Sequence, residues 1–448
     1  MRKRPGNWEA TARPSRPTLL SAPLFFPSPE PQIHHPRPQS RRPTLVPQIH
    51  DQTLAAATRP RSGAADHGRA MALQPELIDD AIAEVLLRLP PDEPKHLFRA
   101  SLVCKTWLRI ITDPVFPRRY RAFHGAPPLL GLLHRFGNSS YGDPEPCFTP
   151  VTAVPAFPSP DFDGLEADAL DCRHGRVLIH MVGDRDEDPD LLVWDPVTGD
   201  RHCIPMPDMD CMESSVTVFC AATGCHHLDC HGGPFGVAFL LEGFNDADGG
   251  VESSPGLWAM VYSSETCAWS EPIRASDVSI DRKLGRPTLI GDEIYFALVT
   301  TTVDNVVTIV KYDWRKNCLS PCNPQPPESY KRWISLMVME DSSLGLAGIE
   351  DSRLHMWKRN VIAEGAAEWV QCRVIELETM VPMAGNGNWA HVVGFAEDVG
   401  IIFVKTSAGL FMIKLKSGHV RKVGEPGDYF TALPYMSFCT PGSKAMIL

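Results

Sequence analysis

Two short stretches, "RVLIH" (Arg176–His180) and "LLVWDPVTGDRHCI" (Leu191–Ile204), contain the pattern that decides the fold. The first is an apolar run of strand length, and the second is a strand that ends at an aromatic residue, then a polar turn and a returning strand. Four later segments repeat this arrangement, and their first strands begin at Val237, Ile294, Leu344 and Ile401. Counted from Arg176, the intervals are 61, 57, 50 and 57 residues. Periods near 50 residues with several strands each are typical of propeller blades.

A closed ring is favoured because one four-stranded blade cannot cover its own apolar faces, whereas a ring of blades covers all of them and protects most strand edges. The predicted fold is therefore an all-β propeller over residues 128–448. We expect six blades, with five or seven as alternatives. The sixth blade would form when "YFTALPYMSF" (Tyr429–Phe438) pairs with strands near "PLLGLLHRF" (Pro128–Phe136) and "FTPV" (Phe148–Val151).

The segment 73–123 has a helical pattern instead. Apolar residues at positions i, i+4, i+7, i+8 and i+11 predict one helix that Pro90-Pro91 ends. Two further short helices are expected from about Lys95 and from about Lys105 to Asp113-Pro114. Three short helices cannot enclose all of their large apolar groups, so part of this surface must face something else. The apolar positions of the first helix are Ile78, Ile82, Val85, Leu86 and Leu89.

Residues 1–70 contain twelve of the 42 prolines and eleven Lys and Arg against four acidic residues. Such a segment cannot bury enough apolar surface to offset the entropy of ordering, so it is predicted to be a disordered Pro/Arg-rich tail. An organelle transit peptide is an alternative, as is a start of the natural chain at Met71.

Charge and composition exclude several classes of function. The net charge is −11, and because residues 1–70 are basic, the remainder is strongly acidic, which argues against a broad grip on nucleic acid. No apolar run approaches the roughly 18 residues of a membrane span. Thirteen cysteines scattered through a long chain indicate reduced thiols, and we expect a cytoplasmic or nuclear protein.

The stretch "LQPELIDDAIAEVLLRLPPDEPKHLFRASLVCKTWLRII" (Leu73–Ile111) resembles the F-box. The usual F-box pattern is Leu-Pro, a helix ending in Leu-Pro, then a Leu-rich helix and Val-Cys-Lys-x-Trp. Here Leu89-Pro90 ends the first helix and Val103 begins the Val-Cys-Lys-x-Trp group. Gln74 splits the opening Leu-Pro, although Pro75 still lies at the helix start.

Further along, "ALDCRHGRVL", "LLVWDPVTGD", "GCHHLDCHGGPFGV" and "YMSFCTPG" are similar to the F-box-associated β-propeller region of a large plant family, found especially in grasses. The resemblance implies that the helices dock on a Skp-family linker protein, which joins them to a cullin and RING ubiquitin ligase. The propeller would then hold an unknown protein substrate. Carried over by motif, the residues that form or support the docking surface are Pro75, Leu77, Ile78, Leu89, Pro90, Leu97, Leu102, Val103, Cys104 and Trp107.

Two other functions stay open: a scaffold that binds the linker without assembling a ligase, and a propeller enzyme of glycosidase or metal-oxidase type. We expect no enzyme, no catalytic residue and no cofactor, because the sequence has no phosphate-binding loop, His-Glu-x-x-His, nucleophile elbow or dinucleotide fingerprint. Cys104 beside Lys105 is interpreted as a small apolar filler in a helix interface rather than a reactive thiol. Long stretches at 205–215, 244–254 and 321–330 are candidate substrate loops by length alone.

One segment, "CAATGCHHLDCHGG" (Cys220–Gly233), has the residue types of a zinc site. Its three cysteines are each five residues apart, and the two-residue spacing typical of zinc knuckles is absent. We therefore predict no metal and interpret these residues as buried or loop thiols and polar histidines, with zinc as the alternative. "DRDEDPD" (Asp184–Asp190) departs from a calcium loop because Pro189 interrupts it and it has no loop Gly or terminal Glu. The candidate zinc ligands are Cys220, Cys225, His226, His227, Cys230 and His231, with His202 and Cys203 upstream.

Overall fold

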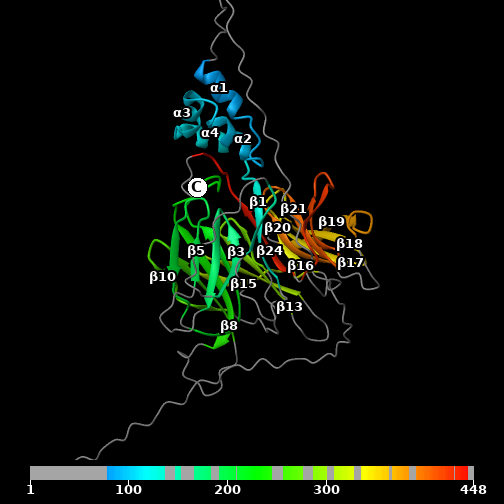
Figure 1. Ribbon diagram of the computed structural model, residues 1–448. Coiled ribbons are helices and arrows are strands. Elements are labelled where there is room, and N and C mark those ends of the chain that lie inside the picture. Colours follow the sequence, from blue (N-terminus) through cyan, green and yellow to red (C-terminus); the bar gives the residue numbers. More distant parts are fainter. Residues whose placement is uncertain are drawn as a thin grey trace, which may run out of the picture. The chain divides into compact units, whose positions relative to one another are not determined.

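The computed structural model describes residues 78–136, 147–152, 166–182, 191–207, 209–244, 256–275, 286–299, 307–326, 334–362, 366–382, 390–427 and 429–441. All of them belong to one compact unit, Leu73–Leu448. It consists of four helices followed by a six-bladed propeller (Figure 1), so the predicted fold class is confirmed. The predicted tail at residues 1–70 and the acidic stretch at 184–190 lie outside the described residues.

The helical segment contains one helix more than predicted. Pro114 was interpreted as the end of the third helix, but it is the N-cap of a fourth. The side chain of Asp113 accepts a hydrogen bond from the backbone N–H of Val115 at 2.8 Å. Pro117 lies in the first turn, where a missing N–H costs nothing because no intrahelical acceptor exists there. The helices are α1 (Asp79–Leu86), α2 (Lys95–Ser101), α3 (Lys105–Thr112) and α4 (Val115–His124).

Helix α1 is shorter than the predicted helix, and its apolar positions do not form one buried stripe. Ile82 and Leu86 are buried, whereas Ile78 and Val85 are 71% and 58% exposed. The helix ends at Leu86, four residues before Pro90, so the last predicted turn is not helical. None of the four described helices has the length or the apolar composition that crossing a membrane requires.

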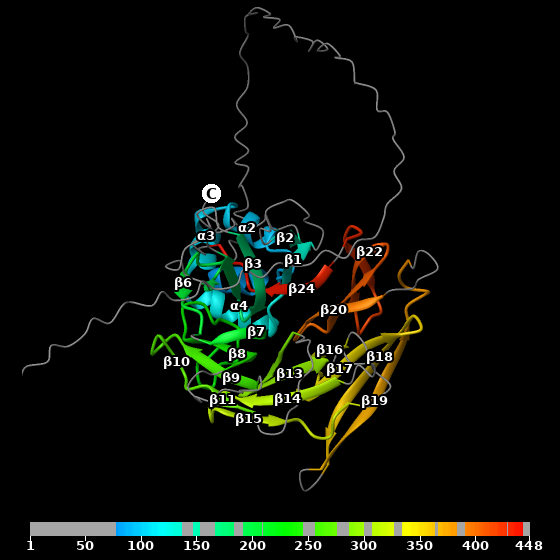
Figure 2. The same ribbon diagram turned by 90° about the horizontal axis from the view of Figure 1, so that it is seen from below.

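The propeller has six sheets arranged around a common centre (Figure 2). Blade 1 contains β3 (Glu166–Arg173), β4 (Arg176–Val182), β5 (Leu191–Trp194) and β6 (Arg201–Ile204). Blade 2 contains β7 (Asp210–Cys220), β8 (Phe235–Phe244), β9 (Gly256–Ser263), β10 (Ala268–Trp269) and β11 (Ile273–Arg274), and blade 3 contains β12 (Thr288–Ile290), β13 (Glu293–Val299), β14 (Val307–Asp313) and β15 (Cys318–Pro321). Blade 4 contains β16 (Ile334–Val338), β17 (Leu344–Glu350), β18 (Arg353–Val361) and β19 (Ala367–Glu376), and blade 5 contains β20 (His391–Ala396), β21 (Ile401–Thr406), β22 (Gly409–Lys414) and β23 (Val420–Gly424).

Blade 6 closes the ring by joining the two ends of the propeller. It contains β1 (Leu129–Phe136), β2 (Cys147–Pro150) and β24 (Tyr429–Met436), in the order β2-β1-β24. Both pairings are antiparallel, and Leu133 of β1 lies opposite Leu433 of β24. Strand β24 in turn contacts β20 of blade 5 and β3 of blade 1. The predicted closure between the C-terminal stretch and the first two strands is therefore confirmed.

The sequence repeat identified the second strand rather than the first in blades 1 to 5. The predicted starts at Arg176, Leu344 and Ile401 coincide with the starts of β4, β17 and β21. The predicted starts at Val237 and Ile294 fall within two residues of the starts of β8 and β13. The strands β3, β7, β12, β16 and β20, which open blades 1 to 5, were not recognised. These strands carry several of the contacts between neighbouring blades, such as β3 with β7 and β16 with β20.

Six apolar clusters fill the spaces between successive blades. Side chains of one strand alternate between two of these clusters. Phe296 of β13 packs toward blade 2, while its neighbours Tyr295 and Ala297 pack toward blade 4. Each blade is therefore apolar on both faces, which is why a single blade could not be stable in water and why the ring must close.

Gly394 lies in β20 at the closing contact between blades 5 and 6. A β-carbon there would overlap the carbonyl oxygen of Ala432 in β24, and backbone atoms cannot yield as a flexible side chain does. We expect Gly394→Ala to lower the stability by about 1–3 kcal/mol, the usual range for overpacking, measured as an earlier midpoint of urea unfolding. Gly233→Ala is the matched control, because its β-carbon would meet its nearest neighbour at an ordinary 3.5 Å. Equal midpoints of urea unfolding for the two variants would contradict the close contact between Gly394 and Ala432.

Candidate functional site

The four helices share one small core. Tyr120 of α4 donates a hydrogen bond to the carbonyl oxygen of Leu89 at 2.8 Å, and a ring nitrogen of His124 lies 2.9 Å from the carbonyl oxygen of Leu87. These two bonds hold the turn after α1 against α4. The core also contains Phe438, which follows β24, and Leu228 of the propeller packs against it. The buried members from the helical segment are Ile82, Leu86, Leu87, Leu97, Ala100, Ile111, Phe116 and Tyr120.

This core leaves an apolar patch uncovered, which we call the docking patch: Ile78, Leu102, Val103, Cys104 and Leu108. Leu102 is 83% exposed and Val103 is 63% exposed. Both precede α3, in which the N–H of Leu108 bonds to the carbonyl oxygen of Cys104 one turn earlier. The start of α1 is held beside α3 by an ion pair between Asp79 and Arg109, which places Ile78 at the same end of the helical segment.

The residues predicted for a docking surface divide into three groups. Ile78, Pro90, Leu102, Val103 and Cys104 are exposed. Leu89, Leu97 and Trp107 belong to the helical core or pack against it, so they support the patch from below. Pro75 and Leu77 lie outside the described residues.

Cys104 differs from its interpretation as a filler in a helix interface. It is exposed and forms the N-cap of α3 without a side-chain capping bond. Its side chain is therefore not packed inside a helix interface of this chain. Leu108 is a member of the patch that the sequence analysis did not select, although its position one helical turn after Cys104 was visible in the sequence.

The helical segment is joined to the propeller through the loop between β7 and β8, residues 221–234, which we call the joint loop. Leu228 of this loop packs against the helical core, and Asp229 forms an ion pair with Arg121 of α4. His231 bonds through one ring nitrogen to Asp195 at 2.6 Å and through the other to Ser437 at 3.1 Å. The joint loop thus connects the helices, blade 1 and the segment after β24.

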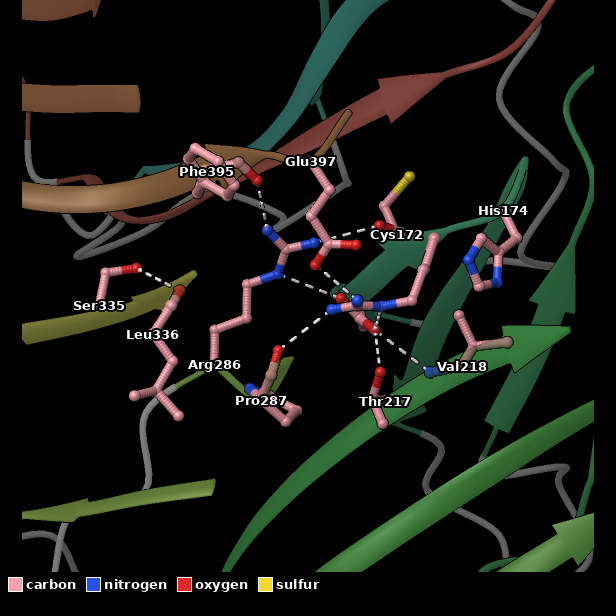
Figure 3. A network of polar contacts seen from close by, with 12 residues as sticks. Cys172, His174, Thr217, Val218, Arg286, Pro287, Ser335, Leu336, Phe395 and Glu397 are labelled. Carbon is pink, nitrogen blue, oxygen red and sulfur yellow. Dashed lines mark hydrogen bonds and ion pairs between the residues drawn. The ribbon is translucent and has the colours of Figure 1, made fainter. Parts of the chain in front are cut away.

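A buried network of charges lies where blades 1, 2, 3 and 5 meet (Figure 3). Asp171 of β3 is fully buried and accepts hydrogen bonds from Thr217 at 2.6 Å and from Arg286 at 3.2 Å. Arg173, also of β3, donates to Glu397 at 2.6 Å and to the carbonyl oxygen of Pro287 at 3.1 Å. The bond between Arg173 and Glu397 links residues that are 224 positions apart in the chain.

The network keeps Asp171 ionised. Burial by itself raises the pKa of this carboxyl group, but the positive charges of Arg286 and Arg173 and the hydrogen bond from Thr217 outweigh it and lower the pKa below its usual value. The guanidinium of Arg286 also donates to the carbonyl oxygens of Phe395 and Cys172. Every charge in the network therefore has a partner of opposite sign, as buried charges require.

Two pockets adjoin these features in the described part of the chain. One, of about 50 Å³, is lined by Arg173, His174, Glu397 and other residues of the network and the joint loop. This volume holds little more than ordered water, whereas pockets for drug-sized ligands measure about 300–1,000 Å³. A second pocket, of about 320 Å³, is lined by residues of blades 1 and 2, among them Arg176 and Phe235.

Four of the eight residues weighed as zinc ligands come together in the structure. The ligand atoms of Cys220, Cys225, His227 and Cys230 all lie within 4.8 Å of one another. The other four are not part of this cluster: His231 bonds to Asp195 and Ser437 instead, and the exposed residues are His202, Cys203 and His226.

Residues 75–119 match the family model of the F-box domain. The chain therefore contains an F-box domain, which covers all four helices except the last residues of α4, followed by a six-bladed propeller. Among curated proteins, none matches the chain.

Several solved structures match the chain at low identity and low TM-score. They include an exo-β-1,3-galactanase from Phanerochaete chrysosporium, with 12% identity, 42% of this chain and 48% of that chain covered, and a TM-score of 0.27. A putative 6-phosphogluconolactonase from Bacteroides fragilis has 10% identity, 58% and 68% coverage and a TM-score of 0.31. Puromycin hydrolase has 10% identity, 57% and 38% coverage and a TM-score of 0.32. The match thus spans about half of the galactanase, and at these TM-scores the likeness says nothing about activity.

Proposed function

We propose that this chain is a substrate receptor of a cullin and RING ubiquitin ligase. In this proposal the F-box domain docks on a Skp-family linker protein, which joins it to the cullin, and the propeller holds the target protein. The observation that carries the proposal is the F-box match at residues 75–119, on which the exposed docking patch lies. Its place of action would be the cytoplasm, the nucleus or both.

The exposure of the docking patch supports a partner at this surface. Exposed aliphatic side chains are common singly, but Leu102 and Val103 are adjacent and sit at the Val-Cys-Lys-x-Trp group of the F-box. The desolvation of such a cluster supplies the apolar centre of a stable interface. Trp107 and Leu89 then act mainly by fixing the patch, since both pack on the helical core.

The chain would contribute position rather than bond chemistry. A target held on the propeller is kept near the charged ubiquitin carrier, and tethering of this kind raises the effective concentration of the reacting groups. The propeller suits a binding role because its loops gather at the rims of a rigid ring. Of the three candidate stretches, 205–215 belongs to strand β7 from Asp210 onward, so it is not one long loop. Most of 244–254 and the end of 321–330 lie outside the described residues, so the target surface itself stays a prediction.

We expect a reconstituted complex of this chain, a Skp-family linker, a cullin and a RING protein to ubiquitylate proteins captured by the propeller. Targets would be identified by affinity capture from proteasome-inhibited cells and then added to the purified complex. Transfer that requires the chain supports the receptor role. A complex that binds the linker but never recruits the cullin would favour the scaffold alternative instead.

A propeller enzyme is the remaining alternative. It would require substrate turnover by the purified chain in the absence of ligase components. Glycoside turnover, or turnover that depends on a redox metal, would overturn the receptor proposal.

A further inference from the structure

The joint loop brings together three thiols and one imidazole. Cys220 is the last residue of β7, and Cys225, His227 and Cys230 follow in the loop. The sulfurs of Cys225 and Cys230 are 3.7 Å apart, and the sulfur of Cys230 is 3.6 Å from Nδ1 of His227. A disulfide requires about 2.05 Å between sulfurs, so these cysteines are not paired covalently.

These two distances fit a tetrahedral metal site, and the remaining pairs of ligand atoms lie within 4.8 Å of one another. With Zn–S bonds of about 2.3 Å and Zn–N bonds of about 2.0–2.1 Å, two sulfurs on one ion lie about 3.8 Å apart, and a sulfur and a nitrogen lie about 3.5 Å apart. The separations of Cys225, His227 and Cys230 agree with both values to about 0.1 Å. Four converging protein ligands leave no open position, which is typical of structural rather than catalytic zinc.

The backbone of the joint loop explains how ligands without knuckle spacing converge. Gly224 and His227 have φ values of +68° and +56°, so the chain turns back between Cys220 and Cys225 and again before Cys230. The backbone N–H of His227 donates a hydrogen bond to the sulfur of Cys225 at 3.4 Å, which holds the two residues in the same turn. The five-residue spacing that argued against zinc in the sequence is therefore compensated by two left-handed positions.

His174 supports the cluster from outside. Its ring stacks on the ring of His227, with centroids 3.9 Å apart and planes 9° from parallel. Its Nδ1 accepts a hydrogen bond from the backbone N–H of Cys220 at 3.0 Å. Metal sites commonly have such outer partners, which hold the ligands in position. Cys220 and Cys230 are buried, so the thiols are shielded from solvent on that side.

We propose that Cys220, Cys225, His227 and Cys230 bind one Zn²⁺ ion that holds the joint loop in a single conformation. Thiolate and imidazole ligands in tetrahedral arrangement select zinc over calcium or magnesium, which prefer oxygen. The proposal does not depend on the ligase function, because it concerns only the joint loop.

A bound ion would act on the helical segment through the two residues that lie between the ligands His227 and Cys230. Leu228 and Asp229 lie between His227 and Cys230, and they make the contacts to the helical core and to Arg121. The carbonyl oxygen of Cys230 also accepts a hydrogen bond from Arg176 of blade 1. An ion bound by the neighbouring residues would therefore fix the F-box domain on the propeller.

The test is metal analysis of the purified full-length chain after expression with added zinc and extensive dialysis. We expect about one zinc per chain, reduced to background in Cys225→Ser and in His227→Asn. His226→Asn and Cys203→Ser are matched controls, because both residues are exposed and outside the cluster. Equal zinc contents in His226→Asn and His227→Asn would overturn the assignment.

A second measurement does not depend on whether the variants fold. Zinc is removed from the wild-type chain with a chelator and Co²⁺ is added. We expect the visible absorption of tetrahedral Co²⁺ with thiolate ligands, its replacement by one equivalent of Zn²⁺, and faster proteolysis within residues 221–234 in the metal-free chain. An absence of tetrahedral cobalt absorption in a chain purified without zinc, or the presence of iron in place of zinc, would overturn the proposal.

Discussion

Replacing Val103 by aspartate is expected to weaken binding of a Skp-family linker protein by a hundredfold or more. Val103 is 63% exposed and is not a member of the helical core, so the change leaves the fold intact. In the complex the carboxylate would be buried among apolar groups without a partner, which costs several kcal/mol. A hundredfold corresponds to about 2.8 kcal/mol, within that range.

The measurement is calorimetric titration of the purified chain with the linker protein, together with thermal unfolding to verify the fold. Val361→Asp is the matched control: Val361 lies on β18 of the propeller and is 64% exposed, so the chemical change is the same at a site outside the patch. Leu102→Asp should behave as Val103→Asp does. If the linker binds all three variants as tightly as the wild type, the docking patch is not the interface.

Trp107→Ala and Leu89→Asp are poorer tests of the same interface. Both side chains pack against the helical core, so their removal lowers stability as well as binding. Only substitutions at the exposed residues of the docking patch can weaken binding without lowering stability.

The second large effect is expected at Asp171. Asp171→Asn should lower the free energy of unfolding by about 3–5 kcal/mol, because it removes the carboxylate that neutralises Arg173 and Arg286 in the buried network. The measurement is urea unfolding followed by tryptophan fluorescence. Asp341→Asn is the control: Asp341 pairs with Lys358 at the surface, where an ion pair contributes no more than about 1 kcal/mol. If both variants lose the same free energy of unfolding, the buried network stabilises the fold no more than a surface ion pair does.

The stabilisation of the fold by Asp171 should decrease as the pH falls. Its pKa in the folded chain is lower than its usual value, so its stabilisation is fully present above the unfolded pKa of about 3.9 and is lost as the pH falls through the folded value. The difference in stability between wild type and Asp171→Asn should therefore be constant above about pH 5 and shrink below about pH 4. A difference that grows on acidification would contradict the assignment of a charged Asp171.

The number of blades and the closure of the ring could be predicted because they follow from repeated apolar strands. The strands that open blades 1 to 5 could not, and β3 shows the reason for blade 1. β3 contains Asp171 and Arg173, and charged residues indicate a loop unless their partners are known. Those partners come from blades 3 and 5, more than 100 residues away, so only the closed ring makes a buried strand of this composition stable.

The candidate site was predictable to a similar extent. The F-box pattern located the right helices, but a helical period does not say which apolar side chains face their own core. Leu97 is in the core and Leu102 is exposed, although both follow from the same motif. The thiol and imidazole cluster was set aside for its spacing, and the left-handed turns that bring its members together were not visible in the residue types alone.

The strand that closes the ring has a consequence for synthesis. Strand β24, which pairs with β1, and Phe438, which enters the helical core, both lie about 300 residues after β1 in the chain. A ribosome must therefore synthesise the chain through Phe438 before either domain can finish folding. A premature stop codon before Tyr429 would yield a chain that contains the F-box sequence but whose propeller cannot close, so that apolar blade faces stay exposed.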